Sequence, residues 1–349
     1  MITACISLAH HDSSLCILKD EKIKLFIQEE RLTRIKRSAI LTDKYLPYLK
    51  KQKIDQLILI NFLNQEVVDS FITKLNKQKI KIDNIIVDHI NHHLFHAASA
   101  FYLSGFKKAI ALVIDGWGAL FENNFYETTS IFEASYNNKF INIFKNLTYD
   151  PNRHTSYDTN QIKDYDLKIT HRLDVGVMYG TVSKYLGFDR LDGGKTMGLS
   201  GYGKPSKNIP DILYKDEANM NLFKNDRTLD VVNLNKKNLA YAMQKALEKI
   251  FIINIEYIKN KTNIKNIVFS GGCALNVLGN SKILKCHRDI NLFIDPVPTD
   301  SGQSIGGAYY YYYKNAFKPR QTKLNNIFLG PEYNIEKEIK YESNRQFFR

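Results

Sequence analysis

Residues 92–118 read HHLFHAASAFYLSGFKKAIALVIDGWG, and this stretch decides how the rest of the chain is interpreted. His92 and His96 are four residues apart in an apolar, alanine-rich segment that predicts a helix, with Asn91 placed to cap it. That spacing puts both imidazoles on one helix face. The apolar run that follows predicts a buried strand ending at Asp115. Two histidines and a strand-end carboxylate suit a metal ion, whereas an HxxxH pair alone is more often a surface or packing pair.

One strand pattern occurs twice along the chain. Its short apolar or alternating segments lie at residues 2–8, 14–19 and 23–29, and again at 109–115, 128–134 and 139–147. Each unit has an aspartate in its first turn, Asp12 and Asp115. The repetition predicts a duplicated α/β domain, with a ligand in the cleft between the halves at the strand ends. We expect residues 1–105 and 106–328 to form the halves, with an inserted loop at about 149–170.

The remaining periodicity is mostly helical. Apolar residues at helical spacing predict helices at residues 65–78, 175–188, 239–259, 274–284 and 304–314. A glycine-rich turn is expected at 193–198. Tyr309–Tyr313, on the last of these helices, could stack on nucleic-acid bases, but rings that point all round a helix favour packing.

The composition indicates a globular protein with ample core. The chain has 349 residues, of which 44% are hydrophobic and 24% charged, and it contains no run of 18 apolar residues. We expect no signal peptide, because the N-terminus starts with a strand-like segment. Four cysteines without CxxC spacing are typical of reduced thiols, so we expect a cytoplasmic protein without a membrane segment. The net charge of +13 could attract nucleic acid or phosphorylated substrates. Dispersed lysines on solvated faces are the favoured explanation.

Several later residues could bind a ligand, and each has an ordinary structural alternative. Gly271 and Gly272 join a strand to a helix, where backbone N–H groups can bind phosphate, but a tight turn needs glycine as well. Asn276, one turn further on, could contact a ligand. Lys195 follows two glycines without P-loop spacing, so it could neutralise phosphate or simply be solvated. Asp300 could cap a helix or point into the cleft as a second carboxylate ligand.

Seven segments occur in an order that resembles a known family. They are HHDSS (10–14), EERLTRIKR (29–37), HHLFHAASAFY (92–102), LVIDGWG (112–118), GKTMGLSGYG (194–203), SGGCALN (270–276) and PTDSGQSIGGA (298–308). Together they resemble the N-terminal transfer domain of the O-carbamoyltransferases of nodulation-factor and antibiotic tailoring. The resemblance covers nearly the whole chain. It implies a duplicated actin-like ATPase fold of the ribonuclease H-like type, similar to the tRNA threonylcarbamoyl-transfer subunit.

The resemblance also implies a site. A divalent metal, Fe(II) by analogy, would be held by His92, His96, Asp115 and Asp300. A second set of residues is assigned to ATP or carbamoyl-adenylate: Gly116, Lys195, Gly198, Gly271, Gly272 and Asn276. His11 and Asp12 resemble a motif near the acceptor site. We infer that a carboxylate there could take the proton from an attacking hydroxyl.

One departure from the family limits the expected reaction. Family members usually continue into a YrdC-like domain, which makes carbamoyl-adenylate from carbamoyl phosphate and ATP. Residues 329–340 resemble the join to that domain, so we expect residues 329–349 to be a remnant of that join. Three explanations stay open: the sequence is a fragment, a separate YrdC-like protein supplies the missing domain, or the chain uses an intermediate made elsewhere. The chain itself is then expected to transfer the carbamoyl group to an acceptor hydroxyl.

The acceptor and two alternatives stay open at this stage. A sugar or antibiotic-like hydroxyl is the favoured acceptor, and a hydroxymethylated base in DNA is an option that the positive charge would suit. One alternative is a non-catalytic, nucleotide-binding scaffold with an actin-like fold, although a scaffold needs no metal ligands. Another is a tRNA threonylcarbamoyl-transfer subunit, which the EERLTR and GKTMGLSGYG segments disfavour.

Overall fold

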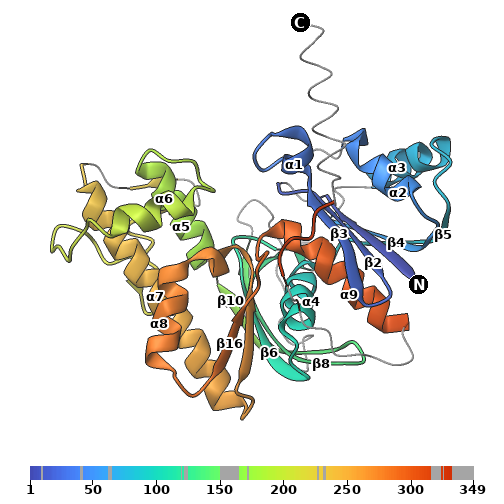
Figure 1. The fold of residues 1–349 in the computed structure, drawn as a ribbon. Helices are drawn as coiled ribbons and strands as arrows, with labels where there is room; N and C mark the ends of the chain where they lie inside the picture. Colours follow the sequence, from blue (N-terminus) through green and yellow to red (C-terminus); the bar gives the residue numbers. More distant parts are fainter. Residues whose placement is uncertain are drawn as a thin grey trace, which may run out of the picture.

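The computed structural model contains two β-sheets joined through a pair of central helices (Figure 1). It describes residues 1–8, 11–39, 42–61, 65–118, 120–121, 125–149, 165–170, 173–225, 228–230, 233–315, 324 and 326–331. The first sheet contains β1 (Ile2–Ser7), β2 (Ser14–Lys19), β3 (Lys22–Gln28), β4 (Ile54–Ile60) and β5 (Ile82–Asp88). The second contains β6 (Lys108–Ile114), β7 (Leu120–Phe121), β8 (Phe125–Ser135), β9 (Lys139–Tyr149), β10 (Asp166–Thr170), β15 (Asn266–Ser270) and β16 (Asn291–Ile294).

Both sheets have the same topology. The first runs in the order β3-β2-β1-β4-β5 and the second contains β9-β8-β6-β15-β16, with β10 added beside β9 and β7 beside β8. In each, three antiparallel strands are followed by two parallel ones. The register places Cys5 opposite Cys16 in the first sheet. This equivalence confirms the predicted duplicated, actin-like α/β fold, while the division at residue 105 stays a prediction.

Two helices fill the space between the sheets. They are α4 (His92–Ser104) and α9 (Gln303–Asn315), which pack against each other (Figure 1). The helix α9 also packs on β1 and β2, whereas α4 packs on β6 and β15. A side chain at Gly306 would collide with the carbonyl oxygen of Phe95, so a glycine is what allows this close approach. The pair thereby brings two segments that are about 200 residues apart in the sequence together between the sheets.

Further helices cover the outer faces. They are α1 (Glu29–Thr33), α2 (Leu46–Lys50), α3 (Gln65–Lys77), α5 (Val175–Tyr185), α6 (Gly193–Ser200), α7 (Lys236–Lys261) and α8 (Val277–Cys286). Two small hairpins complete the described elements: β11 (Leu213–Tyr214) with β12 (Glu217–Ala218), and β13 (Phe223–Asn225) with β14 (Thr228–Leu229). Tyr309, Tyr311, Tyr312 and Tyr313 are buried, which confirms that the tyrosine run packs in the core.

Two sequence expectations differ from the structure. Residues 193–198 form most of the helix α6 rather than a glycine-rich turn. Gly193 and Gly194 occupy its first turn, and the side chain of Thr196, on the same helix, is buried against the rest of the protein. Within the inserted loop expected at about 149–170, residues 166–170 form β10, and residues 150–164 lie outside the described part of the chain.

The described part of the C-terminal segment contacts the first sheet, and the cysteines form no disulfide. The expected remnant begins where the Leu329 carbonyl accepts a hydrogen bond from the Phe26 amide of β3, and residues 332–349 lie outside the described ranges. The four cysteines are free thiols. Among the helices that the structure describes, none combines the length and apolar character needed to cross a membrane.

Candidate metal and nucleotide site

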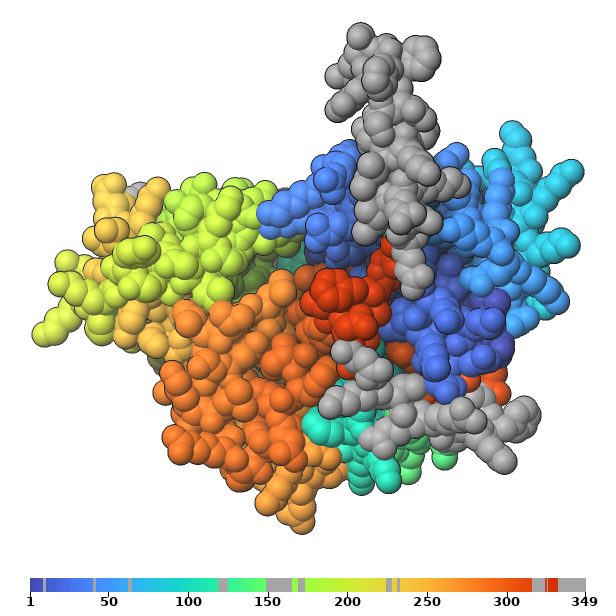
Figure 2. Space-filling model, viewed as in Figure 1, coloured from blue at the N-terminus to red at the C-terminus, as the bar shows by residue number. Residues whose placement is uncertain are grey.

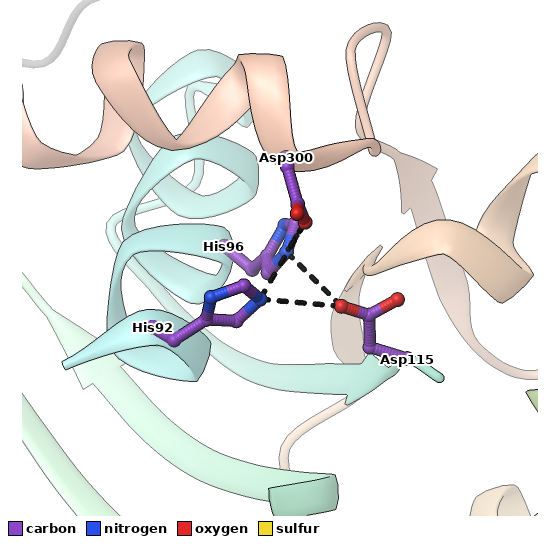
Figure 3. A group of neighbouring side chains, drawn as sticks. All are labelled: His92, His96, Asp115 and Asp300. Atoms are coloured by element: carbon purple, nitrogen blue, oxygen red, sulfur yellow. Dashed lines mark hydrogen bonds and ion pairs between the residues drawn. The ribbon is translucent and has the colours of Figure 1, made fainter. Parts of the chain in front are cut away.

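Four side chains from three separate parts of the chain converge in one place (Figure 3). His92 and His96 lie on the first turns of α4, Asp115 directly follows β6, and Asp300 opens a short 3₁₀ helix before α9. Asn91 does occupy the N-cap of α4, but its side chain donates to Asp88 instead of capping the helix. The structure therefore brings together all four residues predicted as metal ligands.

The separations within this cluster suit a shared cation. The His92 Nε2 atom lies 3.2 Å from Asp115 Oδ2 and 3.5 Å from Asp300 Oδ1, and the corresponding distances for His96 Nε2 are 3.6 and 3.4 Å. One donor atom from each residue lies within 4.8 Å of the other three. Donor atoms that each lie about 2.0–2.2 Å from one ion have separations of this size. Nitrogen and oxygen donors of this kind suit a borderline divalent ion.

Burial and the neighbouring charges shift the pKa values of the cluster in opposite directions. Burial alone would raise the pKa of Asp115, but hydrogen bonds from His92 and His96 hold that pKa well below its usual range. Burial would lower the pKa of His96, but Asp115 and Asp300 outweigh it and raise the pKa to about 9. The cluster thus retains positive charge among its carboxylates, which is the charge that a cation would supply.

A second layer of polar groups orients His96. Its Nδ1 atom lies 3.4 Å from the Ser270 hydroxyl, which donates a 2.9 Å hydrogen bond to Asp295 Oδ2. Ser270 ends β15 and Asp295 follows β16, so the parallel pairing of these strands brings them together. Such groups fix the ring orientation of a metal-binding histidine. Sequence reasoning missed Asp295, and the signal that could have found it is its position directly after the apolar residues 292–294.

The two residues predicted to be catalytic lie beside the cluster. His11 Nδ1 is 3.0 Å from Asp12 Oδ2, and His11 Nε2 is 3.9 Å from Asp300 Oδ2. Burial would lower the pKa of His11, but the Asp12 hydrogen bond and the Asp300 charge raise it to about 9. Asp12 has a φ of +62°, a left-handed conformation that aspartate tolerates. The turn between β1 and β2 of the first sheet therefore lies beside Asp300, one of the proposed metal ligands.

Three of the predicted nucleotide residues surround Asp115. The amides of Gly116 and Gly272 donate to Asp115 Oδ1 at 2.8 and 3.1 Å. Gly271 has a φ of +89°, and a side chain there would collide with the Ile114 carbonyl oxygen. A side chain at Gly116 would meet open space. Glycine is thus required by the fold at 271 but not at 116.

The other three nucleotide candidates lie on different helices. Lys195 and Gly198 are on α6, where Lys195 Nζ is 2.5 Å from Asp192 Oδ2. The Asn276 side chain caps α8 through the Gly279 amide and exchanges hydrogen bonds with Gln244. Within the described residues, no hydrogen bond or ion pair joins Lys195 or Asn276 to the four clustered side chains. Their role in nucleotide binding stays a prediction.

A polar contact joins the two halves near this site. Arg37, after α1, donates to the Leu191 carbonyl at 2.8 Å and to Asp192 Oδ1 at 2.5 Å, and its other nitrogen lies 3.2 Å from Asp189. Figure 2 shows the blue N-terminal residues meeting the yellow-green α5–α6 region above a shaded recess. Sequence reasoning quoted the EERLTRIKR segment but did not predict this contact.

Comparison with known proteins agrees with the fold. A family model described as carbamoyltransferase N-terminus matches residues 51–309, a range that includes all four clustered side chains. Full-length HypF, in a phosphate- and nucleotide-bound form, has a similar fold with a TM-score of 0.54 and 12% identity. That likeness covers 89% of this chain and 55% of the HypF chain.

Two nodulation proteins are similar in sequence. Nodulation protein NolNO of Sinorhizobium fredii is 23% identical over 95% of this chain and 51% of its own length. Nodulation protein NolO of Bradyrhizobium diazoefficiens is 22% identical over 73% of this chain and 44% of its own length. The chain thus spans about half the length of these relatives, and it belongs to the carbamoyltransferase family, in the part described as the N-terminus.

Proposed function

We propose that this chain transfers a carbamoyl group from carbamoyl-adenylate to an acceptor hydroxyl. The observation that carries the proposal is the convergence of His92, His96, Asp115 and Asp300 beside the glycine turns and the His11–Asp12 pair. Family membership supports a transferase that acts on carbamoyl groups. The bound nucleotide in the HypF structure supports a nucleotide in a fold of this kind.

The reaction is a substitution at a carbonyl carbon. The acceptor oxygen forms a bond to the carbamoyl carbon, the bond from that carbon to the phosphate oxygen breaks, and AMP leaves with the electron pair. The hydroxyl proton passes to a base. Asp12 is the candidate base, and the 3.0 Å contact with His11 Nδ1 orients its carboxylate.

The remaining residues bind and orient the donor. When bound, a divalent ion such as Fe(II) would supply Lewis-acid polarisation at this site. His92, His96, Asp115 and Asp300 would hold it, with Ser270 and Asp295 orienting His96. The open backbone at Gly116 gives a phosphate group room to approach, and Gly271, Gly272, Lys195, Gly198 and Asn276 are the further candidates for nucleotide binding.

The acceptor is proposed from family chemistry. The names of NolNO and NolO support a sugar or related small-molecule hydroxyl, and a hydroxymethylated nucleobase is the alternative that the net charge of +13 would suit. The donor forms from carbamoyl phosphate and ATP, and we propose that a YrdC-like protein in the cytoplasm can provide it. Residues 1–105 and 106–328 remain our proposed halves of the transfer cleft.

The decisive experiment measures acceptor-dependent release of AMP. The protein, loaded with Fe(II) under anaerobic conditions, is mixed with ATP and [¹⁴C]carbamoyl phosphate, with and without an added YrdC-like protein. Aminoglycosides, N-acetylglucosamine oligomers and 5-hydroxymethylcytidine serve as acceptors. Transfer of label to one acceptor class, lost in Asp12→Asn and retained in the exposed control Asp211→Asn, supports the proposal.

Three results would contradict it. Carbamoyl-adenylate formed by this chain without the added protein would show that the first step occurs here as well. Nucleotide binding without transfer to any acceptor would favour the scaffold alternative. Transfer of a threonylcarbamoyl group to tRNA, in parallel reactions with threonine and bicarbonate, would favour the tRNA-modifying alternative.

A further inference from the structure

The amide of Gln303 lies against the same atoms that would hold a metal ion. Gln303 is fully buried at the start of α9. Its Nε2 atom lies 2.9 Å from His92 Nε2, 2.9 Å from His96 Nε2 and 3.0 Å from Asp300 Oδ1. Three of the four candidate ligands therefore contact one amide group that the family resemblance does not assign to the site.

The contacts of this nitrogen are unbalanced for an amide. An NH₂ group can only donate, yet two of the three atoms that it faces are the Nε2 atoms of His92 and His96, which donate to Asp115, so only Asp300 Oδ1 is left to accept. A cation in the cluster would favour the opposite orientation of the Gln303 amide, because its field repels the amide hydrogens and attracts the carbonyl oxygen. A half-turn about the last side-chain bond exchanges Nε2 and Oε1 at nearly the same positions, so the exchange needs no additional space.

We propose that Gln303 is a fifth ligand of the bound divalent cation, through Oε1, and that its amide turns over when the cation binds. This inference rests on the proposed metal site. An amide oxygen is a hard donor, and a fifth ligand favours ions that accept more than four donors, such as Mn(II) or Fe(II), over tetrahedral Zn(II). Gln303 would thereby help select the metal.

A second amide completes the device. Asn61, directly after β4, donates through Nδ2 to Gln303 Oε1 at 2.8 Å and to the Ser7 hydroxyl oxygen at 3.0 Å. If Gln303 turns, its NH₂ group faces Asn61, which must then turn as well to present Oδ1. The Ser7 hydroxyl can donate to that oxygen, so Asn61 keeps its hydrogen bonds to Gln303 and Ser7, while the contact of Gln303 with Asp300 is replaced by the bond from Oε1 to the cation. The metal state would therefore be transmitted to the ends of β1 and β4 in the first sheet.

The test measures dissociation constants for Mn(II) and Zn(II) by chelator competition. Gln303→Leu is expected to weaken Mn(II) binding at least about 10-fold, the low end for groups that support a metal site, and Zn(II) binding less. Gln303→Glu, which always presents oxygen, should keep or tighten Mn(II) binding. Gln56→Leu, a buried glutamine that contacts Thr3 and Asn315 away from the cluster, is the matched control and should change neither constant.

A substitution at Asn61 tests whether the Gln303 amide turns when the cation binds. Asn61→Asp can only accept, so it should hold the Gln303 NH₂ group and favour Oε1 toward the cation, which tightens Mn(II) binding. In the Gln303→Leu background that gain should vanish, whereas a purely electrostatic effect of the new carboxylate would persist. If Gln303→Leu does not fold, as judged by circular dichroism, Gln303→Met takes its place in both measurements, because it keeps the unbranched shape and adds no charge but has no amide oxygen.

The outcomes separate this inference from the proposed function. Wild-type protein that binds neither metal at one ion per chain overturns the metal site and the inference with it. Wild-type protein that binds Mn(II), with Gln303→Leu binding it equally or more tightly, overturns only the role of Gln303 as a ligand. In that case the amide merely competes with the cation for the cluster.

Discussion

At the scale of single residues, the two histidines of α4 and the two carboxylates that face them depend on one another for charge balance. His96 is fully buried and faces Asp115 and Asp300 at 3.6 and 3.4 Å. Burying two carboxylates together is unfavourable unless positive charge lies between them. We therefore expect the purified protein to contain about one divalent ion per chain.

Removal of one histidine should abolish that ion binding. His96→Ala takes away a donor, and since changes in outer polar groups alone weaken metal sites 10- to 100-fold, affinity should fall more than about 100-fold. Elemental analysis after desalting measures the metal content. The control is His287→Ala, which removes a buried histidine at the end of α8, outside the cluster. Equal metal content in wild type and His96→Ala would contradict the proposed site.

Sequence reasoning found the ligands but not the amides around them. His92, His96 and Asp115 were accessible because helical spacing and a strand end place them by local rules. Gln303 and Asn61 are 242 residues apart in the chain and meet only through packing of α9 on the first sheet. Glutamine and asparagine carry no local pattern that predicts such a meeting, so the structure was needed.

At the scale of elements, the turn between β15 and α8 should tolerate no side chain. Gly271→Ala would place Cβ against the Ile114 carbonyl and force a non-glycine residue to φ +89°. The conformation alone, with ψ at 157°, costs about 1–3 kcal/mol of stability in a region that is essentially restricted to glycine, and the collision adds to it, so the midpoint of thermal unfolding should drop clearly. An unchanged midpoint would contradict the geometry of the turn.

Gly116 should behave in the opposite way. A side chain at Gly116 meets open space, so Gly116→Ala should unfold at the wild-type temperature. If phosphate approaches the backbone there, the same substitution should weaken binding of a fluorescent ATP analogue, measured by titration. Gly330→Ala, also in open space, is the matched control and should alter neither property. Normal nucleotide affinity in Gly116→Ala would remove Gly116 from the proposed nucleotide site.

The start of α5 should make stability depend on pH. Asp174 occupies the N-cap, and burial raises the pKa of its carboxyl despite hydrogen bonds from Thr128 and Asn146. A raised pKa means that its stabilising contribution is complete below the unfolded pKa, about 3.9, and is lost as pH rises through the folded pKa. Denaturant titrations should therefore show Asp174→Asn gaining on wild type as pH rises above about 4, since asparagine is also a good N-cap.

The exposed Asp211→Asn should not show this trend. A difference between wild type and Asp174→Asn that stays constant with pH would contradict the raised pKa.

The strand β10 and the helix α6 show where prediction at this scale was wrong. The β10 segment is short and polar at both ends, and α6 begins with two glycines, so tertiary pairing and packing decided both against their local sequence.

At the scale of the whole molecule, duplication could be predicted because each half repeats a strand pattern that local rules detect. The equivalent order of strands in the two sheets bears this out. Which residues hold the halves together could not be predicted, since that depends on surface loops that meet only in the folded protein. The contacts of Arg37 with Asp189, Leu191 and Asp192 are the clearest example.

Arg37 should control how far the recess between the halves opens. Its guanidinium donates to three acceptors at residues 189, 191 and 192, before α6. Lys195 and, as the smaller cause, Arg37 hold the pKa of Asp192 well below the usual range. Arg37→Gln removes the charge and the fork of donors. Hydrogen exchange at residues 189–192 should become faster, and a bound fluorescent ATP analogue should dissociate faster.

The ion-pair origin of this effect can be isolated with salt and a matched pair. Raising ionic strength screens exposed charges, so wild type should approach Arg37→Gln in high salt, whereas the variant should change little. Lys53→Gln breaks an exposed ion pair with Asp83 on β5, the edge strand of the first sheet. This control should leave hydrogen exchange at residues 189–192 unchanged. If Arg37→Gln and wild type exchange and release nucleotide at equal rates at every salt concentration, the contact does not couple the halves.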